Sequence, residues 1–451
     1  MPALGENWMP AIPSTKRAVE RLAERLRRVV NVRQEEVAAL FWAFLYFFCL
    51  LCSYYIVRPM RDEMGIAGGV DNLQWLFTGT FLAMLAVVPL FGWVSSRFER
   101  RRFLPAVYGF FIVNLLLFFV LFRSGITHAW VARAFFIWTS VFNLFVVSVF
   151  WSFMTDIFTN LQARRLFGFI AAGGTAGAIC GPLLTTLLVL PLGPANLLPV
   201  SAGLLGIAVF CIHRLGAWHA AASQGTQATP ATAPAIGGQV LAGVRLVLRS
   251  PYLLGICLLM LLFTTLATFL YFQQAQIVRD SFAAPAQRTA VFAAMDLAVN
   301  VLTLGLQVLL TGRLVQWLGL GWTLALLPLL LAAGFLALGL SPVLAVLVLV
   351  QVLRRAGNYA ITRPAREMLY VVLGREEKYK AKNFIDTVVY RGGDALSAWV
   401  YAGLRAIGLS LSAIAFVAVP LALLWAGVAY RLGQAQTQRS GQADQEPVGL
   451  R

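Results

Sequence analysis

The chain has 451 residues, of which 59% are hydrophobic and only 12% charged, and its mean hydropathy is +0.76. Because a soluble globular domain has roughly 45–50% apolar and about 25% charged residues, this composition disfavours a soluble enzyme, a disordered protein and a disulfide scaffold. The net charge is +17, which in a soluble protein would suggest a nucleic-acid partner. In a membrane protein the same excess is typical of cytoplasmic loops, so we expect no nucleic acid partner.

Twelve apolar stretches follow one another along the chain, and each is long enough to cross a bilayer as a helix. The predicted fold class is therefore an all-α integral membrane protein with twelve transmembrane helices. The expected spans are residues 37–57, 75–94, 103–122, 134–157, 166–190, 196–213, 251–274, 290–311, 322–340, 343–372, 384–404 and 409–430.

The regions outside the spans have distinct compositions. Residues 14–30 repeat apolar positions at helical spacing between arginines, which predicts an amphipathic helix on the inner membrane surface. Residues 220–240 are small, polar and interrupted by Pro and Gly, as in a flexible linker. We expect a cytoplasmic N-terminal amphipathic helix (1–36), a first six-helix bundle (37–213), a cytoplasmic linker (214–250), a second six-helix bundle (251–431) and a disordered tail (432–451).

Lys and Arg gather in the two tails and in the loops after even-numbered spans. This asymmetry predicts that both termini lie in the cytoplasm, in a bacterial-type inner membrane. The five cysteines lie in apolar runs, and the three histidines have no metal-ligand spacing. We therefore expect no metal and no cofactor. The chain also has no nucleophile–base arrangement typical of an enzyme.

Two pairs of segments resemble each other between the halves of the chain. Residues 58–62 (RPMRD) in the first span resemble residues 363–367 (RPARE) in the tenth, and residues 162–165 (QARR) resemble residues 380–383 (KAKN). Such repeats are typical of transporters built from two related halves. In addition, residues 92–101 (GWVSSRFERR) resemble the loop motif of the major facilitator superfamily. That resemblance implies two pseudo-symmetric six-helix bundles, with spans one, four, seven and ten around a central cavity.

Charged side chains at membrane depth carry the functional argument, because each costs at least about 2.5–3.5 kcal/mol to insert. Arginine remains charged when desolvated, and its fork matches carboxylate or phosphate oxygens. We therefore expect two opposed arginine clusters, with acids that orient them, to bind a polyanion in the cavity. An alternative for the first cluster is that its arginines reach to the membrane interface. The candidate substrate-binding residues from this argument are Arg58, Arg61, Asp62, Arg363, Arg366, Glu367 and Arg391.

Several other intramembrane residues have two interpretations. Asp156, late in span four, and Asp296, in span eight, are candidates for proton coupling, or they pair with nearby arginines. Arg354 and Arg355 fit either the cavity or the interface. Gly173, Gly177 and Gly181 repeat every four residues, which favours close packing of two helices.

The arginine motifs also resemble those of a known transporter family. Residues 54–62 (YYIVRPMRD), 363–370 (RPAREMLY) and 378–389 (KYKAKNFIDTVV) are similar to the motifs of the nucleotide transporters, the ATP/ADP translocases of plastids and intracellular bacteria. The resemblance implies a twelve-helix transporter that exchanges nucleotides. It also places Arg61 where the family has a phosphate-binding Lys, adds Lys382 and Asp386 to the candidate substrate site, and puts Arg391 near a family Lys.

Two family glutamates are replaced here, by Gln162 and Tyr271. The cationic part of the family site is thus kept and the acidic part is altered. The first hypothesis is a monomeric secondary transporter that exchanges nucleotides (ATP/ADP-type) or a related phosphorylated anion by alternating access. The second is a proton-coupled permease or exporter for another organic anion. The third is a membrane sensor that has a transporter fold but does not transport.

Overall fold

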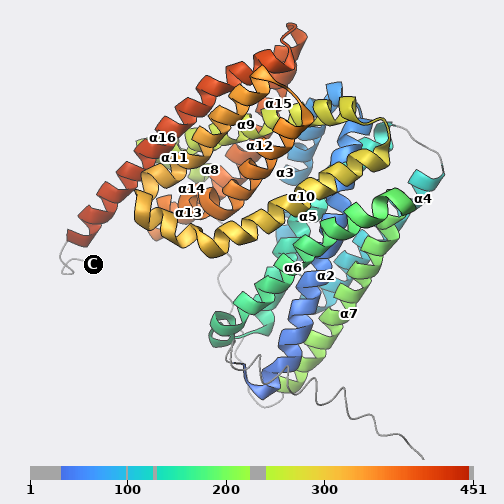
Figure 1. Ribbon diagram of the computed structural model, residues 1–451. Helices are drawn as coiled ribbons and strands as arrows, with labels where there is room; N and C mark the ends of the chain where they lie inside the picture. The colour runs from blue at the N-terminus through green and yellow to red at the C-terminus, as the bar shows by residue number, and fades with distance from the viewer. Residues whose placement is uncertain (1–31, 98–99, 125–128, 224–239, 446–451) are drawn as a thin grey trace, which may run out of the picture.

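The computed structural model describes residues 32–97, 100–124, 129–223 and 240–445, and within these ranges the secondary structure is entirely helical. Eleven helices are long and apolar enough to cross a membrane. They form two bundles that are contiguous in sequence, from blue to green and from yellow to red in Figure 1. The expected all-α membrane fold with two helical bundles is confirmed.

The first bundle begins with the helix that carries the first arginine cluster. Its helices are apolar around most of their circumference, as expected where one face meets lipid and the other meets protein. The α6 helix begins at a capping box, in which Thr159 and Gln162 satisfy each other's backbone N–H groups. The helices are α2 (Val37–Ala67), α3 (Leu73–Arg97), α4 (Arg100–Arg123), α5 (Ala129–Ile157), α6 (Asn160–Leu192) and α7 (Leu197–Ser223).

The second bundle contains two spans that are interrupted by π-helical turns. The turn η3 (Asn358–Thr362) joins α12 to α13, and η4 (Ile385–Val389) joins α14 to α15. Such turns inside helices are frequent at functional sites. The helices are α8 (Val240–Arg249), α9 (Pro251–Ser281), α10 (Pro285–Leu309), α11 (Thr311–Leu340), α12 (Leu344–Gly357), α13 (Arg363–Leu369), α14 (Arg375–Phe384), α15 (Tyr390–Ala406) and α16 (Leu411–Gln445).

The eleventh expected span, 384–404, is the one that does not reach the apolarity of a membrane-spanning helix. This stretch comprises the last residue of α14, the turn η4 and most of α15, and it contains Asp386, Arg391 and Asp394. The segment is helical throughout, and it is polar because two of these charged residues line the cavities described below.

Two expected boundaries are wrong, because helices continue beyond them. The linker expected at 214–250 is shortened by α7, which extends to Ser223, and by α8. The disordered tail expected from residue 432 is replaced by the continuation of α16 to Gln445. The polar composition of this segment did not predict a helix, because contacts with other helices stabilise it. Gly433 packs against Gly321, and Arg439 lies over the ring of Tyr252. The amphipathic helix expected at 14–30 lies outside the described residues.

Glycines bring α6 into direct contact with α2, as their spacing predicted. A Cβ atom added at Gly181 would lie 2.7 Å from the Cys52 carbonyl oxygen and 2.8 Å from Cβ of Tyr55. The two backbones can therefore approach only because this side chain is absent. The contact fixes the part of α2 that precedes the first arginine cluster.

A Gly181→Ala substitution is expected to destabilise the protein by about 1–3 kcal/mol, because the new methyl group overpacks a helix contact. Gly168→Ala, on the same helix, is the matched control, since its added Cβ meets no atom within 4 Å. The control should be neutral or slightly stabilising, because Ala is the better helix former. Thermal unfolding of the purified variants in detergent measures both, and equal melting temperatures would refute the role of the contact.

The two halves are joined most firmly at one end, which we call the closed end. There α2 ends and α10 begins, and Glu63 forms an ion pair with Arg288 across the halves at 2.7 Å. Nearby, the Trp399 indole N–H donates to Thr78 Oγ1 at 3.0 Å, and its ring packs edge-on against Trp75. Toward the other end, where α2 begins and α16 ends, the bundles diverge (Figure 1). We call this the open end.

Candidate functional site

A cavity of about 830 Å³, the main cavity, lies between the two halves. Its size is within the roughly 300–1,000 Å³ range of small-molecule sites. Helices α2, α5 and α6 of the first half and α10, η3, α13 and α15 of the second contribute to its wall. Its polar and aromatic lining includes Tyr54, Tyr55, Arg58, Arg61, Asn143, Trp151, Asn300, Gln307, Tyr359, Arg363, Tyr390 and Arg391.

A second cavity of about 180 Å³, the small cavity, adjoins the first on the side of the closed end. The two cavities share four lining residues, two arginines of α2 and two tyrosines of the second half. The small cavity adds side chains from α9, α12 and α15. Its polar lining is Arg58, Arg61, Asp62, Thr268, Tyr271, Gln274, Gln351, Arg354, Arg355, Asn358, Tyr359, Tyr390 and Asp394.

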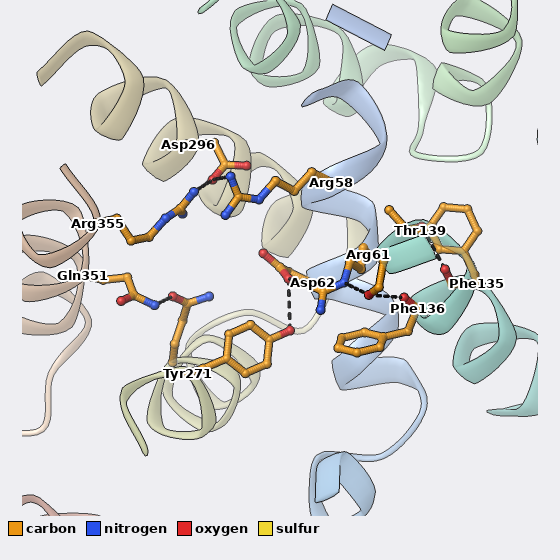
Figure 2. Close-up of polar contacts among 12 residues, drawn as sticks. Arg58, Arg61, Asp62, Phe135, Phe136, Thr139, Tyr271, Asp296, Gln351 and Arg355 are labelled. Atoms are coloured by element: carbon orange, nitrogen blue, oxygen red, sulfur yellow. Dashed lines mark hydrogen bonds and ion pairs between the residues drawn. The ribbon is translucent and has the colours of Figure 1, made fainter. Parts of the chain in front are cut away.

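Arg61 is held in a fixed orientation between the two cavities. Its guanidinium lies 4.0 Å from the ring centroid of Phe136, its Nε–H donates to Ser140 Oγ at 3.1 Å, and its Nη1 donates to Asp62 at 3.1 Å. The hydroxyl of Tyr271 donates to the same Asp62 oxygen at 3.0 Å, across the halves (Figure 2). Tyr271 therefore binds the same carboxylate that holds Arg61.

Asp296 joins Arg58 of the first half to Arg355 of the second (Figure 2). Its carboxylate lies 3.6 Å from Arg58 Nη1 and 2.5 Å from Arg355 Nη2, and its side chain is only 1% exposed. Of the two interpretations of this acid, pairing with arginines is therefore confirmed. The proton-coupling role stays a prediction.

Three further arginines of the second half line the cavities. Arg391 lies 3.9 Å from Asp394, one helical turn ahead on α15. Arg354 donates its Nε–H to Gln351 at 2.9 Å, while Arg363 begins α13 at the wall of the main cavity. Among the described side chains, no carboxylate lies within 4.0 Å of Arg354 or Arg363. These two arginines therefore contribute positive charge that is not neutralised by an ion pair.

The structure brings together only part of the predicted site. Five candidate residues line the two cavities: Arg58, Arg61, Asp62, Arg363 and Arg391. The alternative in which the arginines of α2 reach the membrane interface is wrong, since both lie in the cavity wall between the halves.

Four candidates instead form a separate polar cluster inside the second half. Arg366 donates to Met260 Sδ at 3.0 Å and lies 4.0 Å from Asp386, while Lys382 pairs with Glu367. None of the four is among the residues that line either cavity. The expectation that Arg366 binds substrate in the cavity together with Arg363 is therefore wrong, because Arg366 is turned toward α9, where it contacts Met260.

Asp156 lies at the exposed end of α5 and lines neither cavity. The sequence reasoning also missed Tyr54, Tyr55, Tyr359 and Tyr390, which surround the arginines. In a hydropathy profile these tyrosines cannot be distinguished from other residues of the membrane spans. Their positions, one helical turn from a charged residue, could have indicated that they line the same site.

Comparisons with known proteins agree with this architecture. Residues 18–366 match the Major Facilitator Superfamily, and residues 331–434 match the TLC ATP/ADP transporter family. Comparison with curated proteins gives no significant match. The second match covers less than a quarter of the chain, so it marks a local similarity only.

Solved structures of transporters share the fold at low sequence identity. The nucleoside transporter NupG superposes with a TM-score of 0.60 at 14% identity, covering 90% of this chain and 99% of that one. A POT family transporter in complex with 5-aminolevulinic acid gives 0.59 at 10% identity, covering 88% and 96%. A bacterial homologue of the lysosomal transporter Spinster, inward-facing and unoccupied, gives 0.54 at 13%, covering 90% and 99%. With the superfamily match spanning most of its length, the chain belongs to the Major Facilitator Superfamily.

Proposed function

We propose that this secondary transporter moves organic phosphates, nucleotides among them, by alternating access of its two halves. The observation that carries the proposal is the charge of the cavity wall. Six arginines line the two cavities, against two carboxylates, Asp62 and Asp394. Two of the six, Arg354 and Arg363, have no acidic partner among the described side chains.

Guanidinium groups suit a phosphorylated substrate because each offers a planar fork of N–H donors and remains charged even when it is partly removed from water. The tyrosine rings and the amides of Asn143, Asn300 and Gln307 in the main cavity could stack on and bond to an organic group. The local match to ATP/ADP transporters and the fold shared with a nucleoside transporter support a nucleotide, though the replaced glutamates leave the class broader than ATP and ADP.

Alternating access requires that the contacts at the closed end separate while the bundles approach at the open end. We propose a bacterial-type inner membrane with both termini in the cytoplasm, in which case the open end faces the cytoplasm. The ion pairs between the halves are the contacts that a bound anion would compete with, since Arg58 already holds Asp296. Binding and conformational change would then be coupled through the same arginines.

Exchange of labelled ATP, ADP and smaller organic phosphates in proteoliposomes tests the proposal. Arg61→Gln and Arg363→Gln are each expected to lower exchange by about 10- to 100-fold, because a hydrogen bond to a charged group contributes about 1.5–3 kcal/mol. Arg279→Gln is the matched control, since that arginine is 39% exposed and pairs only with Asp280 among the described acids. Failure of every phosphorylated compound to exchange, with all variants alike, would refute the proposal.

A proton-coupled permease for another organic anion is the second candidate, and the buried Asp296 favours it. Under that alternative, transport depends on an imposed pH gradient, and Asp296→Asn abolishes the dependence. Under organic phosphate exchange, a phosphorylated compound on the opposite side drives uptake without a gradient. Flux measured with and without each driving force separates the two.

A further inference from the structure

The small cavity differs from the main cavity in size and in the density of its charges. It has less than a quarter of the volume, yet four of the six cavity arginines line it: Arg58, Arg61, Arg354 and Arg355. The arginines of α2 line both cavities, so their guanidinium groups can contact ligand groups on either side. A group that is small and strongly anionic would fit the small cavity, with a larger group beside it.

The ion pairs around the small cavity leave two positive charges in excess, because four arginines line it and only Asp62 and Asp296 pair with them. Arg58 and Arg355 share Asp296, and Arg61 pairs with Asp62. The remaining acid of the wall, Asp394, forms its ion pair with Arg391, which is not among the residues that line this cavity. Arg354 is therefore the arginine without a carboxylate among the described side chains, and its one hydrogen bond goes to the neutral Gln351.

We infer that the small cavity binds the terminal phosphate group of the substrate and that Arg354 determines this specificity. This inference rests on the proposed function. A phosphate carries one to two negative charges and three terminal oxygens, so it can bind the free fork of Arg354 and still reach the shared arginines. A carboxylate lacks the third oxygen, and an uncharged nucleoside lacks the negative charge. The organic part would then lie in the main cavity, toward the open end.

A comparison of Arg354 with Arg363 can separate a specific effect at the small cavity from a general effect of positive charge. Arg354 lines only the small cavity, and Arg363 lines only the main cavity. They lie nine residues apart on one helical segment, about 13 Å along its axis. Inorganic phosphate is the smallest ligand that fills a terminal-phosphate site. Its affinity should depend strongly on Arg354 and only weakly on Arg363.

The experiment measures binding of inorganic phosphate and of a nucleoside monophosphate to the purified full chain by calorimetry. Arg354→Gln is expected to weaken inorganic phosphate at least tenfold, and Arg363→Gln less than threefold. Both variants should weaken the nucleoside monophosphate. Thermal unfolding without ligand controls for folding, and Arg354→Lys, which keeps the charge, should recover part of the phosphate affinity.

Equal or greater loss of phosphate binding in Arg363→Gln would overturn the assignment, as would unchanged binding in Arg354→Gln. Absence of phosphate binding in the wild-type protein, together with transport of organic phosphates, would also overturn it while leaving the proposed function intact. If no phosphorylated compound binds or is transported, the proposed function itself is wrong.

Discussion

A Glu63→Gln variant is expected to shift the conformational equilibrium at least about 100-fold toward the alternate conformation, in which the two halves separate at the closed end. Glu63 is fully buried on α2, and both of its oxygens accept hydrogen bonds from Arg288 on α10, at 2.7 and 2.8 Å. Breaking a buried pair on one side costs about 3–5 kcal/mol, because the other charge stays buried without its partner. In the alternate conformation the halves must separate here, so that cost falls mainly on the closed state.

Distances between spin labels across the closed end measure this shift. Labels at Asp71, in the turn before α3, and at Ile407, just after α15, both start from exposed positions. The variant should show a larger population at long distance, and exchange should slow because the return to the closed state is hindered.

Asp280→Asn is the matched control for this prediction. It also removes an acid from an ion pair at the closed end, but the Arg279–Asp280 pair is exposed and lies within one helix. Exposed pairs contribute about 0–1 kcal/mol, so its distance distribution should match that of the wild-type protein. If Glu63→Gln behaves like this control, the ion pair does not hold the closed end.

The second large effect is expected for Asp296→Asn. This substitution leaves Arg58 and Arg355 buried near each other without the carboxylate between them, which should destabilise the empty protein by about 3–5 kcal/mol. It also removes the internal competitor for Arg58, so a phosphorylated ligand should bind more tightly. Ligand should therefore raise the melting temperature of this variant more than that of the wild type.

Thermal unfolding with and without a nucleoside monophosphate measures both parts of the prediction. Asp156→Asn is the control, because Asp156 is exposed and lines neither cavity, and it should behave as the wild type. An Asp296→Asn/Arg355→Met double variant should be less destabilised than the sum of its single substitutions, because it removes a buried charge together with its partner. Additive losses would show that the pair is not coupled.

The sequence predicted the architecture and the chemistry of the site to a useful extent. Apolar runs of membrane length predicted the bundles, since hydropathy depends on local composition. Arg58, Arg61, Arg363 and Arg391 were expected in a central cavity, because a charge at membrane depth is costly unless it faces a polar space. The glycine spacing on α6 likewise predicted a close contact between two helices, which the structure forms with α2.

What the sequence by itself determined is that this is a polytopic helical membrane protein with arginines at membrane depth. The tertiary structure alone decided which of them share a cavity. Arg363 and Arg366 are one turn apart, yet one faces the main cavity and the other packs against α9, because helix rotation is set by packing between helices. Partners distant in sequence, such as Asp296 with Arg58 and Tyr271 with Asp62, meet only when the two halves come together.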